Sequence, residues 1–126
     1  MPYLLDTHTF LWMAASPEKL SARARRACES GELVLSVASI WETAIQYQIG
    51  NLSLPEAPKE FFARNIRLAS VSVMPIHYRH ALTAAALVSE HKDPFDRLLA
   101  AQSIEEDLAC ISIDGRIEEL GAKRLW

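Results

Sequence analysis

The chain has 126 residues, enough for one domain with a substantial core; half of the residues are hydrophobic and 23% are charged. This balance is typical of a globular protein and excludes a disordered or collagen-like chain. A net charge of −3 argues against a passive nucleic-acid binder, which usually carries a basic excess, but it is compatible with an enzyme that gathers its acids in one site.

We expect neither a targeting segment nor a metal-binding or disulfide-bonded set of cysteines. No apolar run reaches the roughly 18 residues that a membrane span requires, and the N-terminus has no signal-peptide pattern. Cys28 and Cys110 have no metal-type spacing, so we expect free thiols in a reducing compartment. We therefore predict a cytoplasmic protein with no membrane partner, folded as a single domain over residues 1–126.

The N-terminal stretch places a carboxylate at the end of an apolar run. Tyr3-Leu4-Leu5 predicts a short buried strand. Apolar residues at helical spacing follow it, at Phe10, Leu11 and Ala14. Asp6 therefore lies at a strand-to-helix junction, where it could cap the helix or face the ligand crevice of an open α/β sheet.

Next in the chain, a helix is expected from Ser21 to about Glu29. It carries three arginines, Arg23, Arg25 and Arg26. We interpret them as a solvated face rather than as a nucleic-acid groove.

The second predicted strand, Leu33 to Ser36, leads into a helix that reaches about Ile49 and ends at Gly50. Ser39 and Glu42 are spaced as a capping box, in which Glu42 would reach back to a backbone N–H. The same position near the carboxyl edge of the sheet would also allow Glu42 to share a site with Asp6.

In the middle of the chain we expect a helix over Lys59–Ala69, a strand over Val71–Ile76 and a helix over His77–Glu90. Three histidines lie in or after this region, at His77, His80 and His91. They do not share the spacing of metal ligands, so we expect surface or helix-end roles.

A second informative stretch begins at His91. Asp93 before Pro94 predicts an N-cap followed by the first helical residue. Asp96 then falls in the first turn, where the helix dipole stabilises an anion by about 0.3–1 kcal/mol. A structural role is therefore available to Asp96 as well.

The last segment predicts a buried strand over Ala109–Ile113, a short helix over Arg116–Leu120 and an edge strand near the C-terminus. Asp114 ends the buried strand, although Asp-Gly is also an ordinary turn pair. The alternation of short strands and helices along the whole chain predicts an α/β fold. We expect a three-layer α/β/α sandwich with a central, mostly parallel sheet covered on both faces.

Four acids follow predicted strands or lie near helix starts: Asp6, Glu42, Asp96 and Asp114. If the sheet brings them together, their repulsion must be relieved by a cation or by protons. Carboxylates without Cys or paired His favour hard cations, so Mg²⁺ is the expected cofactor, with Mn²⁺ able to replace it. Such a cation can activate water and neutralise phosphate charge, which predicts metal-assisted hydrolysis of phosphodiesters.

The acids lie in four motifs: Leu5-Asp6-Thr7-His8-Thr9, Ser39-Ile40-Trp41-Glu42, Asp93-Pro94-Phe95-Asp96-Arg97-Leu98-Leu99-Ala100-Ala101-Gln102, and Ser112-Ile113-Asp114. In order and spacing these motifs resemble the PIN-domain family and, more narrowly, the VapC-type ribonuclease toxins of type II toxin–antitoxin systems. The resemblance runs nearly end to end and is most specific from Asp93 to Gln102.

This resemblance implies an acidic quartet made of Asp6, Glu42, Asp96 and Asp114. Asp6 and Asp96 would be the direct Mg²⁺ ligands, whereas Glu42 and Asp114 would bind the metal through water or orient the nucleophile. Hydroxyls of Thr7 and Ser112 would support these ligands. The family further implies a PIN-like fold, cleavage of RNA by water, a homodimer, and inhibition by a small cognate antitoxin protein.

Two alternatives remain at this stage. One is a PIN-like module that binds RNA or a partner without cutting. The other is a receiver-type phosphoacceptor domain, which needs an acidic pair after the first strand and a lysine after the fifth. Asp6 is single and the first lysine after Asp114 is Lys123, so the sequence favours the nuclease over the receiver domain.

Overall fold

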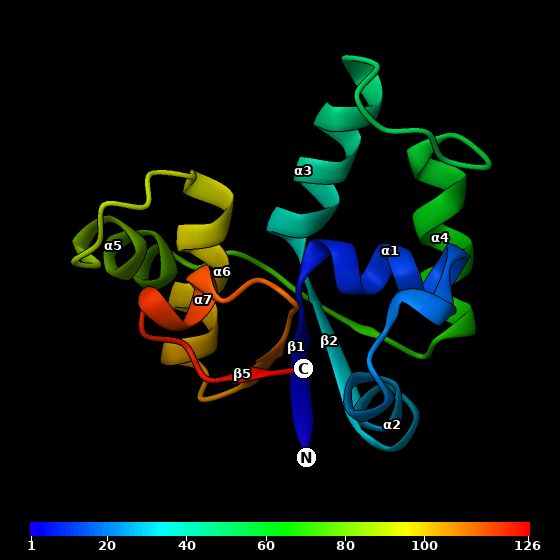
Figure 1. Cartoon of the computed structure of the whole chain (residues 1–126). Coiled ribbons are helices and arrows are strands. Elements are labelled where there is room, and N and C mark those ends of the chain that lie inside the picture. The colour runs from blue at the N-terminus through cyan, green and yellow to red at the C-terminus, as the bar shows by residue number, and fades with distance from the viewer.

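Five parallel strands form the central sheet of the computed structural model, which describes residues 1–126 (Figure 1). The strands are β1 (Pro2–Leu5), β2 (Glu32–Ser36), β3 (Ser72–Met74), β4 (Ala109–Ile111) and β5 (Arg124–Leu125). They lie in the order β3-β2-β1-β4-β5, and every neighbouring pair is parallel. The predicted α/β fold with a parallel sheet is confirmed.

Seven α-helices and one 3-10 helix connect these strands. They are α1 (Thr7–Ala15), η1 (Pro17–Lys19), α2 (Ala22–Ser30), α3 (Val37–Gln48), α4 (Pro58–Leu68), α5 (Tyr78–Ala86), α6 (Pro94–Glu105) and α7 (Arg116–Glu119). In Figure 1, α1, α2 and α4 lie on one side of the sheet, and α5, α6 and α7 lie on the other. This is the three-layer sandwich that the alternation of elements predicts.

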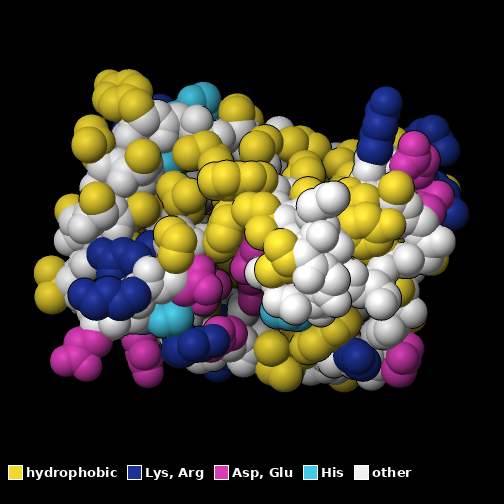
Figure 2. All heavy atoms as spheres, turned by 90° about the horizontal axis from the view of Figure 1, so that it is seen from above, with side chains coloured by type: hydrophobic (Ala, Val, Ile, Leu, Met, Phe, Trp, Pro, Cys, Tyr) yellow, Lys and Arg dark blue, Asp and Glu magenta, His cyan; other side chains and the backbone are white.

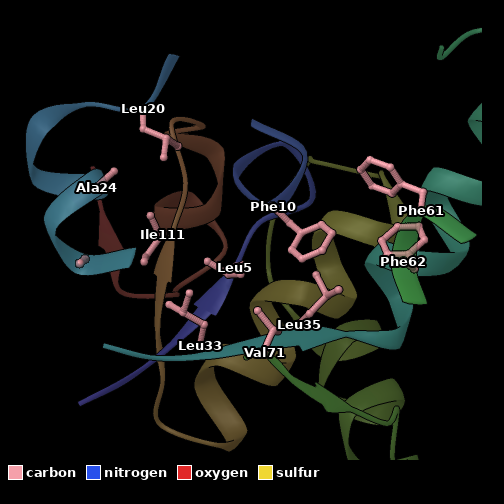
Figure 3. Close-up of a cluster of buried hydrophobic side chains, with 11 residues drawn as sticks. Leu5, Phe10, Leu20, Ala24, Leu33, Leu35, Phe61, Phe62, Val71 and Ile111 are labelled. Atoms are coloured by element: carbon pink, nitrogen blue, oxygen red, sulfur yellow. The ribbon is translucent and has the colours of Figure 1, made fainter. Parts of the chain in front are cut away.

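Side chains alternate along β1 and divide between two hydrophobic cores. Leu5 packs in the core beneath α1, α2 and α4, together with aromatic rings such as Phe10 and Phe61 (Figure 3). Leu4 belongs to the opposite core, with Leu99 of α6. Each of these five side chains is at most 2% exposed, and burial of one such side chain contributes about 1.5–3 kcal/mol. The sheet is thus covered on both faces, which explains the uninterrupted apolar run of β1.

The direction of chain progression across the sheet reverses at β1. From β1 the chain proceeds to β2 and β3 on one side, whereas β4 pairs with the other side of β1. Open α/β sheets bind ligands at such a switch point, outside the carboxyl ends of the strands. Asp6 follows β1 directly and Ser112 follows β4 directly, so both lie at this point.

This strand order also bears on the receiver-domain alternative. Receiver domains share the flavodoxin-like order, in which the third strand lies next to the first. Here β3 is an edge strand that pairs only with β2. The sheet therefore does not match the receiver fold.

Three elements are shorter than the sequence predicts. The helix expected over His77–Glu90 ends at Ala86, and the strand expected over Val71–Ile76 covers only Ser72–Met74. Pro75 follows that strand and has no N–H to continue the ladder. The strand expected over Ala109–Ile113 ends at Ile111.

His80 has the expected helix-end role but is buried, which corrects the alternative of a surface role. His77 occupies the N-cap position of α5, which agrees with a helix-end role. His80, however, is 0% exposed. Its Nδ1 accepts the backbone N–H of His77 at 3.0 Å, and its Nε2 lies 2.8 Å from a carboxylate oxygen of Glu106. His80 thus caps the start of α5 as a helix-end residue. It can do so while buried because both ring nitrogens have partners, which the spacing of the histidines could not indicate.

Cys28 and Cys110 are both free thiols, as predicted. The three arginines of α2 are exposed, as expected for a solvated face. None of the helices combines the length and the hydropathy needed to span a bilayer.

Candidate active site

All four predicted acids line one pocket at the carboxyl edge of the sheet. The pocket has a volume of about 410 Å³ and nine lining residues. They are Asp6, His8, Trp12, Glu42, Asp93, Asp96, Ile113, Asp114 and Arg116. Figure 2 looks down on this edge and shows acidic side chains gathered in a hollow near the middle of the face. Residues more than 100 positions apart in the chain, such as Asp6 and Asp114, therefore meet here.

Asp6 is both a helix cap and a buried anion. Its Oδ1 accepts the backbone N–H of Thr7 at 2.7 Å, and its Oδ2 accepts the hydroxyl of Ser112 at 2.6 Å. Asp6 is 8% exposed and forms no ion pair with Lys, Arg or His. Burial raises the pKa of Asp6, and the charge of Asp96 adds to that rise, while the two hydrogen bonds oppose it. The carboxylate thus has no salt-bridge partner, although the charge of His8 also opposes the rise in its pKa.

Glu42 reaches the pocket from the second turn of α3. The capping box predicted for Ser39 and Glu42 is wrong, because α3 follows β2 without a loop and Ser36 is the N-cap. The hydroxyl of Ser36 accepts the backbone N–H of Ala38 at 3.0 Å. Glu42 instead accepts the hydroxyl of Thr7 at 2.7 Å through Oε1. The backbone at the start of α3 thus leaves the Glu42 carboxylate available to the pocket.

The environment of Glu42 is also electronegative. Burial raises its pKa, the hydrogen bond from Thr7 opposes the rise, and the charges of Asp96, Asp93 and Asp6 add to it. This electrostatic coupling indicates that these acids are close enough to repel one another.

Asp93 and Asp96 lie at the start of α6, where the sequence places them. Asp93 is the N-cap and accepts the backbone N–H groups of Phe95 and Asp96 at 2.9 and 3.2 Å, and Pro94 is the first helical residue. The predicted cap is confirmed. Asp96 is oriented by a residue that the sequence did not assign to the site, His91, whose Nε2 lies 2.8 Å from Asp96 Oδ2.

His91 comes from the irregular segment between α5 and α6. Its side chain is 14% exposed, and its carbonyl accepts a hydrogen bond from Arg97 at 3.0 Å. The expected surface role is therefore wrong for this residue. The separation of only five residues between His91 and Asp96 is the one hint of this contact in the sequence. The contact itself depends on the path of the irregular segment before α6.

Ser112 links the first and the fourth acid. Its hydroxyl donates to Asp6 and accepts the backbone N–H of Asp114 at 3.0 Å. The Asp114 carboxylate faces Arg116, whose Nε lies 3.1 Å from both oxygens and whose Nη2 lies 2.9 Å from Oδ2. Hydrogen bonding to Arg116 lowers the pKa of Asp114. Asp114 is thus the acid of the quartet that has an arginine partner.

The chemistry of the donor set suits a hard cation. No group of three or more His, Cys, Asp or Glu side chains is arranged to hold a metal ion. Even so, five carboxylates and no cysteine line the pocket, which is the ligand type that Mg²⁺ and Mn²⁺ prefer. Asp6 and Glu42 have raised pKa values and no ion pair. A divalent cation would supply the positive charge that these two groups lack.

Comparisons with known proteins identify a matching family model, a relative and solved structures of the same fold. The family model for the PIN domain matches residues 3–123. Ribonuclease VapC22 of Mycobacterium tuberculosis (strain ATCC 25618 / H37Rv) is 34% identical over 123 residues, which cover 90% of this chain and 88% of VapC22.

Two solved structures share the fold. The first is VapBC2 from Rickettsia felis bound to a DNA fragment from their promoter: its matching chain has a TM-score of 0.71 and 13% identity over 99% of this chain and 98% of that chain. The second is a toxin–antitoxin complex from Klebsiella pneumoniae, with a TM-score of 0.66 and 14% identity over 98% and 96% of the two chains. At these identities the likeness is one of fold.

Proposed function

Since the chain belongs to the PIN domain family, we propose that it is a metal-dependent endoribonuclease that hydrolyses RNA phosphodiester bonds. The observation that carries the proposal is the meeting of Asp6, Glu42, Asp96 and Asp114 in one pocket at the switch point of the sheet. The relative VapC22 bears the name of a ribonuclease, which supports RNA as the substrate.

In this proposal Asp6 and Asp96 hold a divalent cation, Mg²⁺ or Mn²⁺. When bound, the cation supplies positive charge for the scissile phosphate and activates the attacking water. Both carboxylates are already oriented by protein donors, Asp6 by Ser112 and Asp96 by His91. Because these carboxylates are held in place, less free energy is needed to reorient them when a cation and substrate bind.

Glu42 has the role of orienting the attacking water. Thr7 holds its Oε1, so the second carboxylate oxygen can accept a hydrogen bond from that water. The raised pKa of Glu42 makes it a stronger proton acceptor than an ordinary surface glutamate. Asp114 completes the quartet from the segment after β4, next to Arg116.

The family relationship extends the proposal to the biological role. We propose that the protein is the toxin of a toxin–antitoxin pair, that it works in the cytoplasm as one domain and a homodimer, and that a small antitoxin protein inhibits it. Large apolar side chains at the surface, among them Trp41 at 57% and Leu82 at 65% exposure, support protein partners of this kind.

RNA cleavage by purified protein tests the proposal. Mixed RNA is incubated with Mg²⁺, with and without EDTA, and with the variants Asp6→Asn and Asp96→Asn. Asp107→Asn is the matched control, because Asp107 pairs with Lys123 at the surface and its side chain is 85% exposed. We expect cleavage that EDTA stops, that both pocket variants lose by at least about a hundredfold, and that the control retains.

Other results of this experiment would contradict the proposal. Cleavage that persists in both pocket variants, or that EDTA does not affect, would refute the metal-dependent mechanism. Binding of RNA without any cleavage by the wild-type protein would favour the non-catalytic PIN-like module instead. Circular dichroism of every variant establishes that a loss of activity is not a loss of folding.

A further inference from the structure

Arg116 is the only lysine or arginine that lines the acidic pocket. The chain has 13 Lys and Arg residues, and the remaining pocket wall contains five acids. A polyanionic strand that enters the pocket therefore meets a single permanent positive charge of the protein there.

Arg116 is presented from a fixed backbone. It is the first residue of α7, and its backbone N–H donates to Asp114 Oδ1 at 3.0 Å. Its neighbour Ile117 is 3% exposed and packs in the hydrophobic core that contains Leu4 and Leu99. The position of the Arg116 Cα is thus set by packing, independently of where its side chain points.

The Arg116 side chain, in contrast, is 58% exposed, and that of its partner Asp114 is 30% exposed. Nε and Nη2 contact the Asp114 carboxylate, while Nη1 makes no hydrogen bond within the protein. An ion pair that is this open to solvent is weak and opens readily. The guanidinium can therefore exchange its partner without disturbing the fold.

We propose that Arg116 binds the backbone phosphate of the RNA substrate, and that it gives up its two-oxygen contact with Asp114 to do so. The planar fork that spans the two Asp114 oxygens fits two phosphate oxygens in the same way. The exchange also frees the Asp114 carboxylate when a strand is bound. The inference rests on the proposed function and assigns the sugar–phosphate backbone, rather than a base, as the group that Arg116 recognises.

Binding of a labelled single-stranded RNA of mixed sequence to the Asp6→Asn protein tests this inference without cleavage. In that background Arg116→Ala should weaken binding roughly tenfold, as expected for one charge-assisted contact. The slope of log affinity against log salt concentration should fall by about 0.7, the value for one phosphate contact on a single strand. Arg116→Gln, which keeps a polar N–H donor and removes the charge, should behave in the same way.

Arg23→Ala is the matched control, because Arg23 is exposed on α2 and does not line the pocket. It should leave affinity and salt slope unchanged. If both Arg116 variants bind RNA with the affinity and slope of Asp6→Asn alone, the inference is overturned while the proposed function stands. If the Asp6→Asn protein does not bind RNA and the wild-type protein does not cleave it, the proposed function fails as well.

A second comparison separates phosphate binding from a role in holding Asp114. In an Asp6→Asn, Asp114→Ala background, an arginine that only positions Asp114 has nothing left to position, so Arg116→Ala would cost no further affinity. Direct binding of phosphate predicts that the roughly tenfold loss persists. Absence of any further loss would therefore overturn the inference.

Discussion

Asp6 combines burial with the lack of a cationic partner, which is unusual for an aspartate. The residue is 8% exposed, and it accepts hydrogen bonds from the backbone N–H of Thr7 and the hydroxyl of Ser112 but forms no salt bridge. Burial raises its pKa above the ordinary value of 3.8. The folded state therefore holds the Asp6 proton more tightly than the unfolded state does, and ionisation of Asp6 destabilises the fold.

This imbalance gives a prediction for pH and stability. Because the pKa is raised on folding, the cost of the charge is absent below pH 3.8 and is fully present once the pH exceeds the raised value. In EDTA, Asp6→Asn should therefore unfold at a higher temperature than the wild-type protein near pH 7. The difference should shrink as the pH falls toward 3.8. Thermal unfolding followed by circular dichroism measures both effects.

Asp107→Asn serves again as the control and should show no such gain, because Asp107 is exposed. Equal melting temperatures of wild type and Asp6→Asn near neutral pH would contradict this account of Asp6. A gain that grows as the pH falls would contradict it as well.

At the residue scale, the sequence predicted the acids of the pocket better than it predicted their partners. Asp6 and Asp114 follow strands, and Asp96 follows an Asp-Pro cap; these are local signals. The contacts of His91 with Asp96 and of Arg116 with Asp114 each involve one residue in an irregular segment, His91 or Asp114, and such segments have no periodic pattern.

Among the elements, α6 organises one wall of the site through Arg97. Its guanidinium donates to the carbonyls of Ala84, Leu87 and His91 at 3.0, 2.6 and 3.0 Å. These carbonyls belong to the end of α5 and to the segment that follows it. Arg97 therefore explains why α5 ends earlier than predicted and why His91 is held next to Asp96.

Replacement of Arg97 should loosen this segment. Arg97→Met keeps an apolar stem but leaves the three carbonyls without their charged donor, so the free energy of unfolding should fall by about 1–3 kcal/mol. Urea denaturation measures the change. Arg67→Met, at an exposed position of α4, is the control and should change stability by less than about 0.5 kcal/mol. Equal losses in the two variants would contradict the role of Arg97.

The start of α6 was predictable from its cap, whereas the start of α3 was not. Asp93 before Pro94 left one choice, and α6 begins there. For α3 the sequence predicted Ser39 as the cap and assigned Ser36 to the preceding strand. The direct passage from strand to helix selected Ser36, which moved Glu42 from a cap into the pocket.

Charge is distributed unevenly over the whole molecule. Outside the pocket, which contains five acids and Arg116, the chain has 11 acids and 12 Lys and Arg residues. The net charge of −3 thus arises from the pocket, and the remainder of the protein is slightly basic. A negatively charged strand is therefore repelled mainly at the site itself, where a divalent cation reverses the local sign.

The strand order β3-β2-β1-β4-β5 was not predictable from the sequence. Alternating strands and helices indicate a parallel sheet, but several orders satisfy that pattern. The order observed places the ends of β1 and β4 side by side, and this adjacency brings Asp6 and Ser112 into contact.

The central claim is that Asp6 and Asp96 share one divalent cation. Anomalous diffraction from crystals grown with Mn²⁺ tests it most directly. We predict a Mn²⁺ peak in contact with both carboxylates, which disappears in crystals of Asp96→Asn. Mn²⁺ bound elsewhere, with neither carboxylate in contact with an ion, would contradict the claim.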